Sequence, residues 1–391
     1  MDLDFDASDE AFRTEAREWL AVHVPVAPLP SLETAEGFAA HRDWEAALAA
    51  DRWSVVSWPE EFGGRGSSLL RWMIFEEEYY AAGAPGRVSQ NGISLLAPTL
   101  FEHGTAEQRA RALPAMARGE VIWAQAWSEP ESGSDLASLK SAAVRTEGGW
   151  LISGQKTWSS RAAFADRAFG LFRSDPDADR PHRGLTYLMF PLDAAGVTVR
   201  PIGRLDGKPA FAELFLDEVF VPDEDVIGEP GQGWRVAMST TGDERGLTLR
   251  SPGRFTAAAD RLTALWREYG DPADTALRDR VADAVIGARA YRLFSYAGAS
   301  RILHGQGGPA GAASSLNKIY WSELDIALHE TALDLLGPYG ELADHATEAP
   351  GLGSWSEGYT FSLAGPLYAG TNEIQRDIVA ERLLGLPKGR R

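Results

Sequence analysis

The chain has 391 residues, which is enough for two or three domains of about 150 residues each. Its formal net charge of -18 argues against nucleic acid as the main partner, because a phosphate backbone would be repelled. The absence of cysteine removes disulfides, thiolate zinc sites and thiol nucleophiles, and no metal site is predicted. An acidic start and the lack of any long apolar run predict a cytoplasmic protein without signal peptide or membrane span.

The first third of the chain has a helical pattern. Phe12, Ala16 and Leu20 recur at the spacing of one helix face. Further alanine-rich helical patterns cover 37–50, 69–82 and 105–118. Pro and Gly clusters separate these patterns, as expected for loops between helices.

From about Val121 the pattern changes to that of strands. Ser141–Thr146 and Trp150–Lys156 flank a Glu-Gly-Gly turn and predict a hairpin. Other short runs rich in β-branched and aromatic residues cover 168–173, 185–190, 197–200 and 211–221. Their regular punctuation by Pro and Gly is typical of a sandwich or barrel.

After Gly231 the helical pattern returns. Long segments cover 232–267, 274–304, 312–336 and 373–384, and the stretch 339–357 is predicted as a surface loop. The sequence therefore predicts three domains in chain order. These are an N-terminal helical domain at 1–120, a central β-domain at 121–229 and a C-terminal helical domain at 230–391.

The first motif that could carry chemistry is the segment Gln125–Asp135. Small residues at Ser132, Gly133 and Ser134 allow a backbone turn to approach an oxygen-rich ligand such as a diphosphate. A plain polar loop at the entry to a β-domain explains the same string. No Gly-x-Gly-x-x-Gly or Gly-x-x-x-x-Gly-Lys-Ser/Thr pattern follows a strand here, so Rossmann and P-loop sites are excluded.

The second motif, Gly154–Ser160, ends the predicted hairpin. Trp158 could stack on a planar ring while Ser160 bonds the polar edge of that ring. The alternative is an ordinary core tryptophan.

The third motif, Gly365–Arg376, opens the last helix. Thr371 or Asn372 is a good N-cap, and a helix N-terminus can bind a phosphate or ribose. The alternative is a capped helix without a ligand.

Taken together and in this order, the three motifs resemble the acyl-CoA dehydrogenase family, and the resemblance covers essentially the whole chain. It implies a mainly helical fold with a helical N-terminal domain, a central β-barrel or sandwich and a C-terminal four-helix bundle. It also implies FAD as cofactor and α,β-dehydrogenation of an acyl-CoA or carrier-protein thioester. In that reaction a carboxylate takes the α-proton and flavin N5 accepts the β-hydride.

The resemblance also assigns roles to individual positions. Flavin contacts are implied for Gln125, Trp127, Ser128, Gly133, Ser134, Trp158, Ser160, Thr371 and Glu373. Substrate contacts are implied for Ser134, Arg245, Tyr368, Ala369 and Gly370. The backbone N–H of Ala369 would help to polarise the thioester carbonyl.

The catalytic base is not at its commonest place, because Ala369 stands where most family members have a glutamate. Some members carry the glutamate on the helix after the β-domain, and Glu244 matches that position. Ala237, Thr241 and Glu244 share one largely uncharged helix face, which favours a raised pKa for a base. The alternative is a solvated surface glutamate.

The part of the family pattern that reaches a neighbouring subunit is altered. Leu265–Asp274 lacks the usual Arg-x-x-Phe-Gly, and Asp334-Leu-Leu-Gly-Pro338 replaces Gln-x-x-Gly-Gly. We therefore expect either a homo-oligomer or a hetero-oligomer with a paralogous subunit, with an electron-transfer flavoprotein as electron acceptor. Two alternatives remain open: a non-catalytic half-site subunit, and a flavin-dependent monooxygenase on the same fold.

Overall fold

The computed structural model describes residues 5–245, 251–304, 310–342 and 346–388. The chain forms two compact units. One unit consists of Pro25–Ser67 and Pro85–Glu244 and contains the sheet; the other consists of Met1–Val24, Ser68–Ala84 and Arg245–Arg391 and is helical. Among the described helices, none is both long and apolar enough to cross a bilayer.

The sheet unit is built on eight strands in the order β6-β7-β3-β2-β4-β5-β8, with β1 paired to β4. Most neighbours are antiparallel; β1 and β2 each run parallel to β4. The strand bounds are β1 Trp123–Ala126, β2 Ala142–Thr146, β3 Gly149–Ser160, β4 Arg167–Arg173, β5 Leu185–Pro191, β6 Val197–Ile202, β7 Phe211–Pro222 and β8 Val226–Ile227. The predicted hairpin and the four other predicted strand runs are therefore confirmed.

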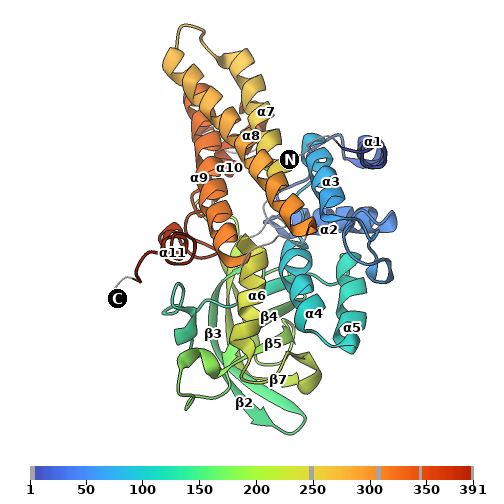
Figure 1. Ribbon diagram of the computed structural model, residues 1–391, viewed down its shortest axis with the longest axis vertical. Coiled ribbons are helices and arrows are strands. Elements are labelled where there is room, and N and C mark those ends of the chain that lie inside the picture. The colour runs from blue at the N-terminus through green and yellow to red at the C-terminus, as the bar shows by residue number, and fades with distance from the viewer. Residues whose placement is uncertain (1–4, 246–250, 305–309, 343–345, 389–391) are drawn as a thin grey trace. The chain divides into compact units, whose positions relative to one another are not determined.

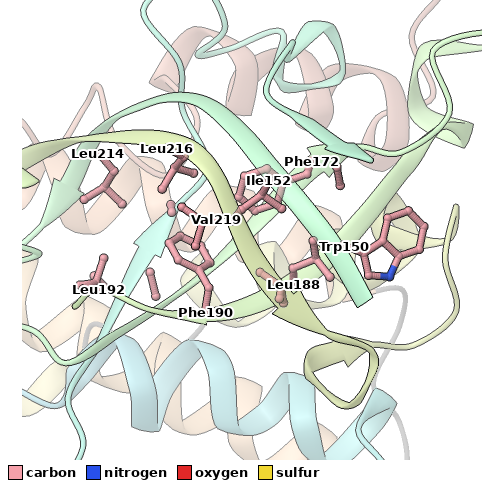
Figure 2. Packing of buried hydrophobic residues seen from close by; sticks show 14 of the residues in the cluster. Trp150, Ile152, Phe172, Leu188, Phe190, Leu192, Leu214, Leu216 and Val219 are labelled. Atoms are coloured by element: carbon pink, nitrogen blue, oxygen red, sulfur yellow. The ribbon is translucent and has the colours of Figure 1, made fainter. Parts of the chain in front are cut away.

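The sheet encloses an apolar core because alternate side chains on its strands point to one side. Figure 2 shows Ile152, Phe190, Leu214 and Val219 gathered between the strands. These four side chains are fully buried. The core gives the strand ends that carry the first two motifs a rigid base.

Four α-helices accompany the sheet in the same unit: α2 (Ala35–Ala50), α4 (Ala97–His103), α5 (Ala106–Ala117) and α6 (Gly233–Arg245). Helix α5 starts where the sequence predicts, because Thr105 and Gln108 form a capping box. Its Gln108 Nε2 donates to the carbonyl oxygens of Glu224 and Val226, which ties α5 to the end of the sheet.

The helical unit contains α1 (Ala7–His23), α3 (Leu69–Ala81), α7 (Pro252–Tyr269), α8 (Thr275–Leu303), α9 (Ala310–Leu336), α10 (Ser354–Ser362) and α11 (Asn372–Ile378). Helices α7 to α10 run side by side as a bundle (Figure 1). Their shared core includes Phe255, Ala288, Trp321 and Leu328, all fully buried. The predicted helix–β–helix order is confirmed.

Two local predictions were wrong. The segment 232–267 is not one helix, because Ser251 caps a new helix whose first residue is Pro252. The stretch 339–357 is not a loop throughout, since α10 begins at Ser354. Trp355 packs into the bundle core, and this tertiary contact outweighs the Gly-rich sequence that precedes it.

Candidate functional site

The first motif begins on β1, where Gln125 pairs with Phe169 of β4. Trp127 follows the strand, is buried, and meets Tyr187 edge-on with ring centroids 6.1 Å apart. Gln125 Nε2 and Trp127 Nε1 are both buried without a hydrogen-bond partner among the described residues. Buried donors without an acceptor are costly, so this place suits a polar ligand group.

The segment then folds into a tight turn. Glu129 and Ser132 exchange two backbone hydrogen bonds of 3.0 Å, which places Pro130 and Glu131 at the tip. The Ser132 hydroxyl is used internally, since it donates to Asp135 O at 2.8 Å. Gly133 and Ser134 are exposed, and a Cβ on Gly133 would meet nothing within 4 Å. The backbone at these two residues is therefore accessible to a ligand.

The second motif lies directly beside the first. Thr157 N donates to Ser128 O at 2.8 Å, so the end of β3 and the Trp127–Ser128 segment are joined. The β3–β7 register shifts between Lys156 and Ser159, where β3 has one extra residue. Trp158 occupies this bulge with φ +60°, and its side chain is 59% exposed. The bulge thus turns a large ring outward, next to Ser128.

A buried ion pair joins the same two segments. Lys156 Nζ donates to Glu129 Oε1 at 2.8 Å, and Lys156 has no exposed surface. Burial lowers the pKa of Lys156 to about 8 despite the opposing charge of Glu129. Burial alone would raise the pKa of Glu129, but the charge of Lys156 and donated hydrogen bonds outweigh it, so that pKa lies below its usual value.

Helix α6 packs against the same region of the sheet. Tyr187, which contacts Trp127, shares a 3.3 Å hydrogen bond with Thr240 Oγ1. Thr240 is fully buried and is also bonded to Thr99 Oγ1 at 2.7 Å. Glu244 lies in the last turn of α6, one turn after Thr240. The side chains of Glu244 and Arg245 lie outside the described part of the chain.

The third motif belongs to the helical unit. Ala369 and Gly370 both have left-handed backbone conformations, with φ +56° and +75°. The side chain of Gln375 is fully buried, and its Nε2 donates to the carbonyl oxygens of both residues at 3.1 Å. Thr371 caps α11 by accepting from Ile374 N at 3.3 Å. The turn is therefore fixed by the helix that follows it.

Other residues of this motif are also engaged. Asn372 Oδ1 accepts from the buried Lys318 Nζ at 2.7 Å, which anchors α11 on α9. Hydrogen bonds from its own backbone N–H and from the Thr371 hydroxyl hold the pKa of the exposed Glu373 below its usual value. Tyr368 packs on Trp321 with ring centroids 5.8 Å apart.

Three family models match the chain in succession. They describe the N-terminal, middle and C-terminal domains of acyl-CoA dehydrogenase and match residues 6–120, 124–219 and 231–384. A curated relative, acyl-CoA dehydrogenase IpdE1 of Mycolicibacterium smegmatis, is 38% identical, and the match covers 97% of this chain and 98% of the relative. This chain belongs to the acyl-CoA dehydrogenase family.

Other acyl-CoA dehydrogenases are similar over most of the chain. FadE34 of Mycobacterium tuberculosis is 36% identical over 88% of this chain and 46% of its own length. The solved structure described as Tcur3481-Tcur3483 steroid ACAD has a TM-score of 0.89 at 28% identity, covering 100% of both chains. The ChsE4-ChsE5 complex from Mycobacterium tuberculosis has a TM-score of 0.84 at 29% identity, again over 100% of both chains.

An acyl-CoA dehydrogenase is a flavoprotein oxidoreductase, and its cofactor is FAD. The residues of the sheet unit fit this group. Exposed Trp158 offers a ring for stacking, the backbone at Gly133 is open, and the unpaired donors of Gln125 and Trp127 suit the polar edge of a flavin. The individual contacts predicted for these residues, and for Ser128, Ser134, Ser160, Thr371 and Glu373, stay predictions.

Sequence reasoning missed the residues that hold the motifs in place. Lys156 has the same strand parity as the buried Trp150 and Ile152, and this period of two could have indicated that it points inward. Gln375 and Glu129 gave no comparable signal. Their partners are backbone carbonyls in one case and a lysine on a different strand in the other, and neither contact follows from local pattern.

Proposed function

We propose that this chain catalyses the α,β-dehydrogenation of an acyl-CoA thioester, with Glu244 as the base that removes the α-proton. FAD, when bound, supplies the acceptor for the β-hydride. The observation that carries the proposal is the absence of a carboxylate at Ala369 combined with the placement of Glu244 at the end of α6.

The packing of α6 supports Glu244 as the base. Trp127, Tyr187 and Thr240 form a continuous contact chain from the first motif to this helix. Because Glu244 follows Thr240 by one turn, both positions lie on the same helix face. Thr240 is fully buried, so this face of α6 packs within the sheet unit.

The backbone of the third motif supports a role in orienting the thioester. Ala369 carries only a methyl group, and the left-handed turn at Ala369 and Gly370 is fixed by Gln375. Such a rigid turn suits the polarisation of a carbonyl by backbone N–H groups. In this proposal Ala369 contributes its backbone and Glu244 contributes the proton acceptor.

We further propose that a second, paralogous subunit completes the flavin site, and that the acyl group is bulky and polycyclic. The solved relatives described as Tcur3481-Tcur3483 and ChsE4-ChsE5 are each named for two components, and one is a steroid dehydrogenase. The α7–α8 connection here is short, since α7 ends at Tyr269 and α8 starts at Thr275. This short connection leaves little room for the Arg-x-x-Phe-Gly segment that is usual in the family.

The helical unit has an apolar surface that could receive this subunit. Ile286, Leu293 and Phe294 of α8 are 63%, 42% and 40% exposed, and Tyr320 of α9 lies nearby with 41% exposure. Exposed apolar stripes of this kind are typical of subunit contacts. Electron transfer to a carrier flavoprotein and a cytoplasmic location are parts of the same proposal.

Replacement of Glu244 by Gln tests the base directly. We expect Glu244→Gln to lower turnover with an acyl-CoA by about 10²–10⁴-fold, because a general base contributes that much, while FAD stays bound. Glu229→Gln, at an exposed position ahead of α6, is the matched control and should retain activity. Unchanged turnover in Glu244→Gln would place the base elsewhere.

The subunit proposal has its own test. The chain should purify with less than one FAD per protomer by itself and gain flavin absorbance when co-expressed with its paralogous subunit. Anaerobic bleaching of that complex by a steroid-side-chain thioester, but not by a short linear one, would support a bulky substrate. One tightly bound FAD per protomer without a partner would contradict the half-site proposal.

A further inference from the structure

The turn of the first motif is held in place by a single carboxylate. Glu129 is only 8% exposed, and both of its oxygens accept hydrogen bonds. Its Oε1 accepts from Lys156 Nζ at 2.8 Å and from Ser141 N at 2.9 Å. Its Oε2 accepts from Lys140 N at 2.6 Å. Glu129 therefore ties the base of the turn to the residues just ahead of β2 and to β3.

The ammonium group of Lys156 also donates several hydrogen bonds. Besides Glu129, it donates to Leu171 O at 2.7 Å and to Trp127 O at 3.4 Å. The ring of Phe172 lies 4.8 Å away from Nζ. The lysine thus joins β3, β4 and the Trp127 backbone at one buried point, two residues ahead of the bulge that carries Trp158.

A deeply buried ion pair is in general weak evidence for net stability. Removing both charges from water costs about as much as their attraction returns, and an apolar pair of similar volume is often as stable. The pair does fix the positions of the segments that it joins. A charged hydrogen bond forms only over a narrow range of distances and angles between donor and acceptor. In this protein the segments are those that carry Ser128 and Trp158. The hydrogen bond from Thr157 N to Ser128 O joins the same two segments.

We propose that Glu129 and Lys156 are positioning residues of the flavin site, which set the distance between the Ser128 segment and the Trp158 ring. Neither residue needs to touch the cofactor to do this. The inference rests on FAD binding at these motifs, which is part of the proposed function. It adds a requirement: breaking the pair should lower FAD affinity by more than the accompanying loss of folding stability explains.

The test compares variants of the pair with a matched ion pair elsewhere in the same unit. Lys156→Met removes one charge, and the double variant Lys156→Met with Glu129→Met removes both and avoids an unpaired buried charge. The control is Asp225→Asn, because Asp225 is also buried and pairs with Arg167 at 2.8 Å and with Arg111, and none of these three residues belongs to the first two motifs. All proteins are full-length and are studied with the partner subunit if the wild type needs it.

Three quantities are measured: amide hydrogen exchange, the FAD dissociation constant and the visible circular dichroism of bound flavin. We expect exchange at Lys140 and Ser141 to rise at least tenfold in both pair variants. FAD affinity should fall at least tenfold in both, with an altered flavin spectrum. Asp225→Asn should lower the melting temperature but keep FAD affinity within twofold.

Wild-type FAD affinity and an unchanged flavin spectrum in the double variant would overturn the inference, provided that exchange at Lys140 and Ser141 has risen. A loss of FAD affinity in Asp225→Asn equal to that in the pair variants would also overturn it, because lower stability alone would then explain the loss. A wild type that binds no FAD even with its partner would contradict the proposed function. The exchange data would then still decide whether the pair holds the turn.

Discussion

Gln375 holds the carbonyl oxygen of Ala369 through its side-chain amide, at 3.1 Å and without exposure to solvent. The same Nε2 donates to Gly370 O, so one amide group fixes two successive left-handed residues. A left-handed conformation is unfavourable for an alanine. The hydrogen bonds from α11 offset that cost, and the turn next to the proposed thioester site becomes rigid.

Loss of the Gln375 amide should therefore loosen this turn. Gln375→Leu removes the side-chain donor that the two carbonyl oxygens share, and we expect a loss of about 1–3 kcal/mol of stability. Gln375→Glu has nearly the same shape but no N–H donors, and it should be destabilised in the same direction. Thermal melts followed by circular dichroism measure this. If Gln375→Leu and the wild type have the same melting temperature, the Gln375 amide does not stabilise the turn.

Replacing Ala369 by glycine should have the opposite effect. Glycine adopts φ near +56° without a steric cost, so Ala369→Gly should raise stability by up to about 1 kcal/mol, less the entropy gained by the unfolded chain. Ala290→Gly is the matched control: it lies on the exposed face of α8 and should cost about 1 kcal/mol. If both variants lose stability equally, the conformation at Ala369 is not strained.

Trp158 should matter for the cofactor more than for folding. Its side chain is 59% exposed and meets Phe211 edge-on with ring centroids 5.9 Å apart, so Trp158→Ala should cost no more than about 1.5 kcal/mol of stability. Loss of ring stacking should weaken FAD binding about tenfold, whereas Trp158→Phe should retain much of the affinity. Titration of flavin fluorescence measures both variants. Equal FAD affinity in wild type and Trp158→Ala would remove Trp158 from the flavin site.

Stability at alkaline pH should report on Lys156. Burial lowers the pKa of Lys156 to about 8 in the folded protein from its ordinary value of 10.5. Between these two pKa values Lys156 is protonated in the unfolded chain and largely deprotonated in the folded protein, so a rise in pH favours the folded state. Over the whole interval the gain in stability from this group is on the order of 3 kcal/mol. Below about pH 8 both states are protonated and the contribution is constant.

Lys156→Met isolates this effect, because methionine does not titrate. Urea denaturation at several pH values from 7 to 10 gives the difference in stability between wild type and variant. That difference should shift in favour of the wild type only above about pH 8. A constant difference across the range would mean that Lys156 keeps its ordinary pKa inside the sheet.

The sequence by itself determined the order of the elements and the family. The Glu-Gly-Gly turn between Ser141–Thr146 and Trp150–Lys156 predicts the hairpin, and the helical spacing of Phe12, Ala16 and Leu20 predicts α1. Turns, caps and periods are local, so a single chain segment contains all the information they need. The three motifs were sufficient to identify an acyl-CoA dehydrogenase because their order and spacing are specific together.

Only the tertiary structure decided how the motifs are held. The burial of Lys156 against Glu129, the outward turn of Trp158 at a bulge, and the left-handed turn at Ala369 each depend on partners distant in sequence or on helix packing. Local preference alone disfavours each of these arrangements, and hydrogen bonds and packing formed in the folded chain offset the cost. Periodicity and propensity describe local preference alone, which is why they predict the elements and not these three arrangements.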